Sequence, residues 1–430
     1  MNSRIDKSAW LTTVVVAVLL LLGGTGAHAA IDGLTGPTFN LTASASYIDT
    51  PDGARVLMWG YGPVGGVMQY PGPTLIVNQG DTVTINLTNQ LPLPVSMVFP
   101  GQEGVVATGG TTGLLTQESN APTAVTPGDM VTYTFVANHP GTYTYSSGTR
   151  PDLQVEMGLV GAIIVRPNGA PKQAYNSAAT AFDHEYLFLL TEIDPALHVL
   201  AEQATAGVIT FDAIDTTRAK PVLWFINGRN GPDTLAAANI AWMPNQPYNC
   251  LPRIHPGEKL LLRLVGGGRE MHPFHTHGNN TMQIARDGRL LESAPGAGPD
   301  LAVDDYTTTV MPGATYDALF SWNGAGLGWD IYGHAASDPL QPGEYAPDHG
   351  KPLPVTLPET QDLTFGGFYS GSPFLGAFGV LPPGEGGLNA NGGLFYMWHS
   401  HTERELVNFD IFPGGMMTML IIEPPGVPIE

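Results

Sequence analysis

Two histidines near the end of the chain, His399 and His401, flank Ser400 in the stretch WHSHTERE. On an extended strand the side chains alternate with period two, so both imidazoles of an H-x-H pair point to one face. Imidazole is a frequent ligand of transition metals. The stretch therefore predicts a metal-binding strand, with Ser400 on the opposite face.

A second group of histidines lies upstream, in MHPFHTHGNN at 271–280. His275 and His277 have the same H-x-H spacing and share one face of a strand. His272 lies three residues before His275, so it points to the other face if the chain stays extended past Pro273. We expect His275 and His277 to converge with His399 and His401, which suits copper, zinc, iron or nickel.

The elements that must position these histidines are strands. Apolar residues alternate at Val83, Ile85 and Leu87 within 71–92, which is typical of a strand after a turn. Residues 126–148 repeat this pattern, and 159–167 has the apolar run of a buried strand. A proline-containing loop at about 167–182 then separates this unit from a second one, which begins near 184.

The second unit echoes the first. Residues 256–268 resemble the strand in 71–92, residues 311–334 resemble 126–148, and residues 414–425 close the unit as 159–167 closed the first. Such a repeat predicts a tandem antiparallel β-sandwich with few helices. A Gly/Pro-rich insertion at about 335–392 interrupts the second copy, and it serves either as a functional lid or contact surface or as a surface decoration.

The N-terminus has the pattern of an export signal. Arg4 and Lys7 precede an apolar run at 11–22, and small residues at 27–29 resemble a cleavage site. The run is short for a membrane span. We expect residues 1–29 to be removed, leaving a periplasmic or secreted chain with no membrane span.

The composition limits the partners of the chain. Its 430 residues carry a formal charge of −21 although only 13% are charged, against a typical ~25%. A negative surface repels nucleic acid and attracts cations. Cys250 is the single cysteine, so an internal disulfide is excluded, and we expect this residue to be small, buried core.

Taken together, three stretches resemble the multicopper oxidase family: YPGPTLIVNQGDTVTINLTNQLP, MHPFHTHGNN and WHSHTERE followed by GGMM. The resemblance covers nearly the whole chain after residue 29 and implies an all-β fold of two tandem cupredoxin-like Greek-key domains, at 30–167 and 183–430. It also implies copper as the cofactor, with another divalent metal such as zinc as an alternative.

By this resemblance, His272 matches a ligand of the blue type 1 copper, and His275, His277, His399 and His401 match ligands of a trinuclear copper cluster. Ser400 stands where the family has the cysteine ligand of type 1 copper, and Glu405 stands where a second histidine is expected. Met416 or Met417 matches the weak axial ligand. Secondary candidates for ligands near the cluster are Glu405 and His334.

The first unit departs from the family pattern at every expected ligand. Val98, Pro100, Ser146 and Gly148 occupy the positions of its four cluster histidines. Without a thiolate at residue 400 a blue copper site lacks its defining ligand, so laccase-type oxygen reduction is not expected.

Three functions remain open from the sequence. The chain either binds copper for metal handling or electron transfer outside the cytoplasm, or is an oxidoreductase with an altered copper centre, or is a metal-free structural or binding module. The resemblance also implies a homo-oligomer, since some two-domain relatives place clusters between subunits, and the function implies an extracellular redox or structural partner.

Overall fold

A computed structural model describes residues 31–123, 128–352 and 393–429. The predicted signal peptide and residues 353–392 of the predicted insertion lie outside the described residues. Within them the chain is mostly β-strand, with α-helices only at α2 (Pro151–Gln154) and α3 (Pro195–Thr205). The predicted all-β fold is confirmed. In the same part of the chain, no helix is long and apolar enough to cross a membrane.

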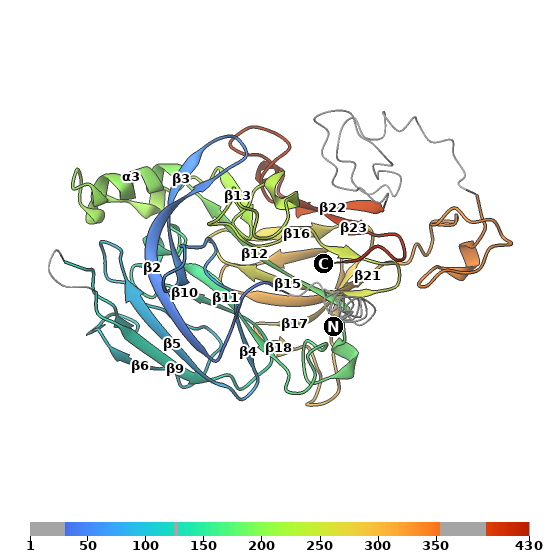
Figure 1. The fold of residues 1–430 in the computed structure, drawn as a ribbon, viewed down its shortest axis with the longest axis horizontal. Helices are drawn as coiled ribbons and strands as arrows, with labels where there is room; N and C mark the ends of the chain where they lie inside the picture. Colours follow the sequence, from blue (N-terminus) through green and yellow to red (C-terminus); the bar gives the residue numbers. More distant parts are fainter. Residues whose placement is uncertain (1–30, 124–127, 353–392, 430) are drawn as a thin grey trace, which may run out of the picture.

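The strands up to residue 166 form two main sheets, seen around the left of Figure 1. One has the order β1-β4-β11-β10, and the other has the order β3-β2-β5-β9-β6. Their bounds are β1 Leu34–Thr35, β2 Thr38–Asp49, β3 Arg55–Pro63, β4 Leu75–Asn78, β5 Thr82–Asn89, β6 Val106–Gly109, β9 Val131–Val136, β10 Gly141–Ser146 and β11 Val160–Arg166; the short strands β7 (Thr111–Thr112) and β8 (Gln117–Glu118) pair with each other. Val83, Ile85 and Leu87 are all buried, as the alternation predicted.

The strands from residue 184 onward form two further sheets. One has the order β13-β12-β15-β21-β17-β18 with β19 beside β17, and the other has the order β14-β23-β22-β16-β20. Their bounds are β12 His184–Ile193, β13 Leu223–Ile226, β14 Arg253–Ile254, β15 Lys259–Gly266, β16 His272–Thr276, β17 Thr281–Arg286, β18 Arg289–Leu290, β19 Val303–Asp305, β20 Thr307–Val310, β21 Thr315–Ser321, β22 Leu394–Ser400 and β23 Met417–Ile422.

The repeat seen in the sequence has a counterpart in the pairing of strands. β5 lies between a parallel partner, β2, and an antiparallel partner, β9, just as β15 lies between β12 and β21. β11 lies between β4 and β10 as β23 lies between β14 and β22. The counterpart of β10 is therefore β22, which follows the insertion, whereas the sequence analysis had matched the stretch that contains β10, 126–148, to residues 311–334.

Two further features differ from the sequence-based expectation. The sheets are mixed rather than purely antiparallel, because chain crossovers bring pairs such as β12 and β15 together in parallel. Helix α3 was not anticipated, although Asp194 accepts a hydrogen bond from Ala196 N as its N-cap and Pro195 is its first residue. This Asp-Pro start is a common helix signal.

The two halves of the chain pack closely through β11 and β12. Ile76 and Ile164 from the first half share a buried cluster with Leu187 and Val265 from the second. β12 is buried along its whole length, which explains the apolar run from Tyr186 to Leu190 at its centre, since a strand covered on both faces needs no polar alternation. The other face of the β12 sheet packs against the sheet with β16 and β22, where Phe188 contacts Phe274 with ring centroids 5.5 Å apart.

Candidate metal centre

Strands β16 and β22 pair antiparallel and bring the two histidine motifs side by side. His275 lies directly opposite His399 in the register. His277 follows two residues later on the same face, and His401 comes just after β22 ends. The His275 ring centroid lies 4.6 Å from that of His277, 5.4 Å from that of His399 and 4.9 Å from that of His401. All four imidazoles thus gather on one face of the strand pair.

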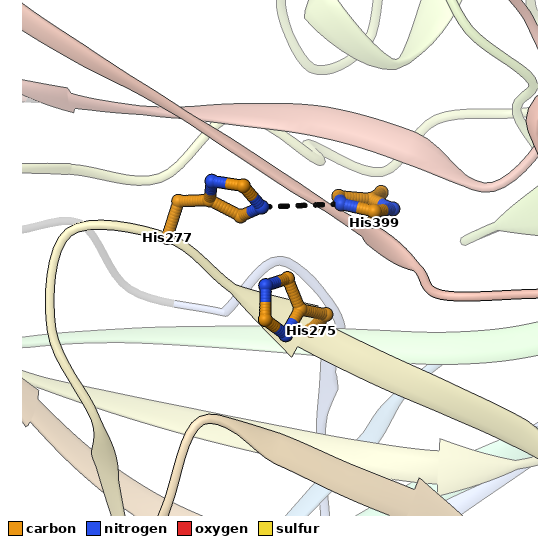
Figure 2. Close-up of side chains that lie close together, drawn as sticks. All are labelled: His275, His277 and His399. Carbon is orange, nitrogen blue, oxygen red and sulfur yellow. Dashed lines mark hydrogen bonds between the residues drawn. The ribbon is translucent and has the colours of Figure 1, made fainter. Parts of the chain in front are cut away.

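Three of these side chains bring nitrogens close enough to share one metal ion. One ring nitrogen from each of His275, His277 and His399 lies within 4.8 Å of the others. The Nε2 atoms of His277 and His399 are 3.3 Å apart and point toward one another (Figure 2). Two nitrogens bound at ~2.0–2.1 Å in a tetrahedral site would be about 3.3 Å apart. His401 lies at the open side, with its side chain 54% exposed.

Neighbouring groups fix the orientation of two of these rings. His399 Nδ1 donates to its neighbour's carbonyl, Ser400 O, at 2.6 Å. His275 Nδ1 is hydrogen-bonded to Thr307 Oγ1 on β20 at 2.8 Å. When Nδ1 is engaged in this way, Nε2 keeps its lone pair for a metal, as in most metal-bound histidines. The ring orientations therefore fit a metal ligand set.

The protonation states also fit metal binding. Burial and the nearby imidazoles lower the pKa of His277 to about 4, and burial lowers the pKa of His399 to about 4 despite its hydrogen bond to Ser400. Burial and His401 also lower the pKa of His275. These rings are neutral near pH 7, and metal ligation requires the neutral imidazole.

The rim of the site is acidic and partly aromatic. Glu403 is exposed and its Oε1 lies 3.9 Å from His401 Nδ1. Asp304 and Asp305 are also exposed and directly precede Tyr306 in the chain. Tyr306 packs edge-on against His275 with ring centroids 5.4 Å apart and is 57% exposed. A rim of carboxylates around neutral nitrogens favours the approach of cations.

His272 lies on the opposite face of β16, away from the four-histidine face. Its side chain is fully buried, with Nδ1 donating to Glu405 at 2.8 Å and Nε2 donating to Glu192 at 3.0 Å. Burial opposes its charge, yet the hydrogen bonds and charges of Glu192 and Glu405 raise its pKa to about 9. His272 is therefore an imidazolium between two carboxylates, and neither nitrogen is free for a metal.

The sequence analysis did not find Glu192, the third member of this ion triad. Its Oε1 accepts from the backbone N–H groups of Arg269 and Glu270 at 2.6 and 3.0 Å. A Cβ on Gly268 would lie 2.1 Å from Glu192 Oε2, so only glycine fits there. The available signal was a glutamate within the apolar stretch EYLFLLTEI of β12, since a buried carboxylate requires a partner.

The remaining residues at the position of a type 1 copper are also engaged elsewhere. Ser400 is fully buried, its N–H donates to Met416 O at 3.0 Å, and its hydroxyl accepts from Thr402 N at 3.3 Å. Met416 and Met417 are buried in separate apolar clusters. The methionines thus pack as core residues, and the structure holds no blue-copper donor set at this position.

In the first half of the chain, the two segments that match the family's histidine motifs lie side by side but contain none of the expected histidines. Val98 and Ser146 exchange backbone hydrogen bonds at 2.8 and 3.2 Å, so the two segments lie side by side. A Cβ on Gly148 would lie only 2.7 Å from Val98 Cγ1. An imidazole at residue 148 would not fit without movement.

Several other groups expected to be structural have defined partners. His184 and His255 share one oxygen of Glu258 at 2.8 and 3.1 Å. His198 Nδ1 contacts Leu57 O at 2.6 Å. Burial raises the pKa of Cys250 to about 12, and its thiol donates to a backbone carbonyl. Cys250 is the buried, unreactive residue that the sequence predicted.

Comparison with known proteins finds similarity to multicopper oxidases and to other proteins named for copper or nitrite. Residues 63–170 match the family model described as multicopper oxidase. A probable nitrite reductase–hydroxylamine oxidoreductase fusion protein of Kuenenia stuttgartiensis is 27% identical over 67% of this chain and 30% of its own length. Multicopper oxidase MCE of Talaromyces pinophilus is 38% identical over 23% of this chain and 15% of its own length. Copper resistance protein A of Escherichia coli is 25% identical over 58% of this chain and 41% of its own length. The chain thus spans less than half of the length of each of these relatives.

Solved structures agree on the fold. The multicopper oxidase mgLAC superimposes with a TM-score of 0.55 at 18% identity, covering 91% of this chain and 87% of the other. The blue copper oxidase of Nitrosomonas europaea superimposes with a TM-score of 0.54 at 19% identity, covering 89% and 85%. These likenesses confirm the cupredoxin-like β-sandwich fold. The chain is therefore similar to multicopper oxidases in residues 63–170 and shares their fold over most of its length.

Proposed function

We propose that the four-histidine face formed by His275, His277, His399 and His401 binds copper, and that the chain carries copper or electrons without laccase-type oxygen reduction. The observation that carries this proposal is the convergence of neutral, oriented imidazole nitrogens from β16 and β22, with two Nε2 atoms 3.3 Å apart. Imidazole sets of this kind suit copper, and zinc is the alternative ion.

Copper would supply one-electron redox chemistry when bound, and the residues of this chain would hold it and control access to it. Thr307 and the Ser400 carbonyl orient two of the rings. The fully buried Ser400 replaces the thiolate, and His272 is held by two carboxylates. Without the blue copper that feeds electrons to a cluster, four-electron oxygen reduction has no route in a single chain.

The exposure of His401 supports the exchange of a metal ion or an electron with other molecules, rather than catalysis in a closed active site. A half-open site with an acidic rim can take a cation from solution and present it to a redox or structural partner. We place this role in the periplasm or outside the cell, in line with the export pattern of residues 1–29, and a homo-oligomer could complete the ligand set with residues of a second copy.

The test is metal loading of the purified chain. The protein is incubated with Cu(II), dialysed, and analysed for bound metal and for electron paramagnetic resonance with nitrogen hyperfine structure. We expect at least one equivalent of copper, lost in a His275→Ala/His399→Ala variant and kept in a His139→Ala variant, whose histidine is exposed elsewhere. Retention of less than one equivalent by the parent chain would contradict the proposal and favour a metal-free module.

A second candidate function is an oxidoreductase with an altered copper centre. The observation that favours it is Tyr306, which is half-exposed and stacks edge-on against His275, because an aromatic ring at the rim can contact a phenolic donor. Oxygen consumption by copper-loaded protein with phenolic or metal-ion donors tests this function. Absence of consumption above that of free copper would exclude it.

A further inference from the structure

A second group of histidines and carboxylates lies far along the chain from the ligands considered so far. It consists of Asp330, His334, Glu344 and His349, in the irregular segment after β21. Figure 1 shows this segment, in orange, projecting from the sandwich. The sequence analysis had placed His334 near the four-histidine face, and His349 follows it in the same segment. The structure instead joins them with two carboxylates.

The four side chains converge on one point. One ligand atom from each lies within 4.8 Å of the others. His334 Nδ1 is 3.7 Å from Asp330 Oδ2 and 3.8 Å from Glu344 Oε2, and His349 Nδ1 is 3.4 Å from Asp330 Oδ2. These separations are close to the ~3.3 Å edge of a tetrahedron with bonds of 2.0–2.1 Å. Only the 2.6 Å contact between His349 and Glu344 is shorter, and that pair must open slightly around an ion.

Backbone groups hold the four ligands in place. Asp330 accepts from Tyr332 N through Oδ1 at 2.8 Å and from Gly350 N through Oδ2 at 2.7 Å. Glu344 Oε2 accepts from Gln341 N at 2.8 Å. His349 Nε2 donates to a carbonyl, Asp338 O, at 2.8 Å, which leaves Nδ1 facing the cluster. Such outer contacts are what orients ligands in metal sites.

The cluster leaves one buried nitrogen without a hydrogen-bond partner. The side chains of Asp330 and Glu344 are 0% and 1% exposed, and two buried carboxylates need compensation. His349 is within hydrogen-bonding distance of Glu344, but His334 Nδ1 is buried without a hydrogen-bond partner. That nitrogen points between two carboxylate oxygens that are too distant to accept from it. A divalent cation at this point would meet all four groups.

We propose that Asp330, His334, Glu344 and His349 form a structural site for a divalent metal of the zinc type. Two imidazoles and two carboxylates give zinc a closed, four-coordinate set with no position left for a substrate. The two carboxylates neutralise a 2+ ion. The site is independent of the copper proposal, since it shares no residue or strand with the four-histidine face.

The position of the site in the fold indicates that a bound metal would stabilise the surrounding segment. Residues 322–352 contain no β-strand and only one 3₁₀ turn, η5 (Ala346–Asp348). The segment meets the sandwich at Gly343, where a Cβ would lie 1.7 Å from Pro256 O. A metal would tie residue 330 to residue 349 and brace this long connection next to that contact, as zinc does in other loop-rich segments that lack a core.

The test isolates this site from the four-histidine face. In a His275→Ala/His399→Ala background, chelator-treated protein is mixed with Zn²⁺, passed through a desalting column and analysed for metal. We expect one retained equivalent, which is lost when His334→Ala/His349→Ala is added and kept when His139→Ala is added instead. In the parent chain, Zn²⁺ should also slow amide hydrogen exchange in residues 323–351 by at least tenfold.

Retention of zinc unchanged by His334→Ala/His349→Ala would overturn the proposal, as would its absence from the background protein. A Glu344→Gln variant covers the case in which the double-alanine variant fails to fold, because the amide keeps the shape of the side chain while removing its charge. It should also lose the retained zinc and the slowed exchange, and retention of both by this variant would equally count against the site.

Discussion

The two faces of the β16–β22 strand pair carry histidines with opposite properties. On one face, His275, His277 and His399 are neutral and partly open, and they present nitrogens to one another. On the other, His272 is fully buried and charged between Glu192 and Glu405. Three residues of separation thus decide whether an imidazole is neutral and faces other imidazoles or is charged between carboxylates. The difference arises from strand alternation and from the partners that each face meets.

The comparison also shows how a buried histidine is accommodated without a metal. A pocket that loses its metal leaves buried polar groups that must find other partners. Here Glu192 and Glu405 satisfy both nitrogens of His272. The other face needs no such carboxylates, because His401 is exposed and the rings of His277 and His399 stay neutral.

The largest expected effect is on stability, from His272→Ala. Removing the imidazolium leaves two buried carboxylates facing each other, and breaking a buried ion group of this kind costs ~3–5 kcal/mol. The free energy of unfolding in urea should fall by that amount. His275→Ala, on the other face of the same strand, is the matched control and should cost less than ~1 kcal/mol. Equal losses for the two variants would remove the proposed distinction between the faces.

The second effect is a dependence of stability on pH that differs between the faces of the metal-free chain. The pKa of His272 is raised to about 9, so the stability it contributes is complete below pH ~6.5 and is lost as pH rises through 9. The pKa values of His277 and His399 are lowered to about 4, so the unfolded chain binds more protons and stability falls as pH drops from 6.5 toward 4.

Thermal unfolding between pH 4 and pH 10 measures both arms of this profile. His277→Ala/His399→Ala should flatten the acid arm and leave the alkaline arm intact. Retention of the full acid arm by that variant would show that other groups cause it.

A smaller effect is expected from the residue that orients His275. Thr307→Val keeps the shape of the side chain but removes the hydrogen bond to Nδ1. Loss of such an outer contact lowers metal affinity by ~10–100-fold. Competition with a coloured copper chelator measures the change, and Thr309→Val, two residues along the same strand, serves as the control. An unchanged copper affinity in Thr307→Val would mean that the hydrogen bond to His275 does not contribute to metal binding.

The smallest expected effect is from Ser400→Cys. This change restores the family's thiol, but Glu405 and Glu192 still occupy both nitrogens of His272. We therefore expect no intense blue thiolate–copper band in visible spectra of the copper-loaded variant. A Ser400→Cys/Glu405→His variant supplies the missing histidine as well and sharpens the comparison. A blue band in the single variant would show that the ion triad opens readily.

Much of the fold and of the four-histidine face could be predicted because both depend on short-range periodicity. Alternation at Val83, Ile85 and Leu87 predicted a strand, and the H-x-H spacing predicted a shared face. The strand at His399 was predicted, but its equivalence to β10 was not, because residues 311–334 resemble the stretch that contains β10. Helix α3 was missed although its Asp-Pro start was visible.

The sequence by itself determined which residues could be ligands, which were absent from the first half, and on which side of a strand each histidine points, because alternation is a local property of the backbone. Only the tertiary structure decided what each histidine meets. Glu192 reaches His272 from a strand 80 residues earlier, and Asp330, Glu344 and His349 gather through an irregular segment. Such contacts depend on chain crossovers and loop geometry, which no local pattern encodes.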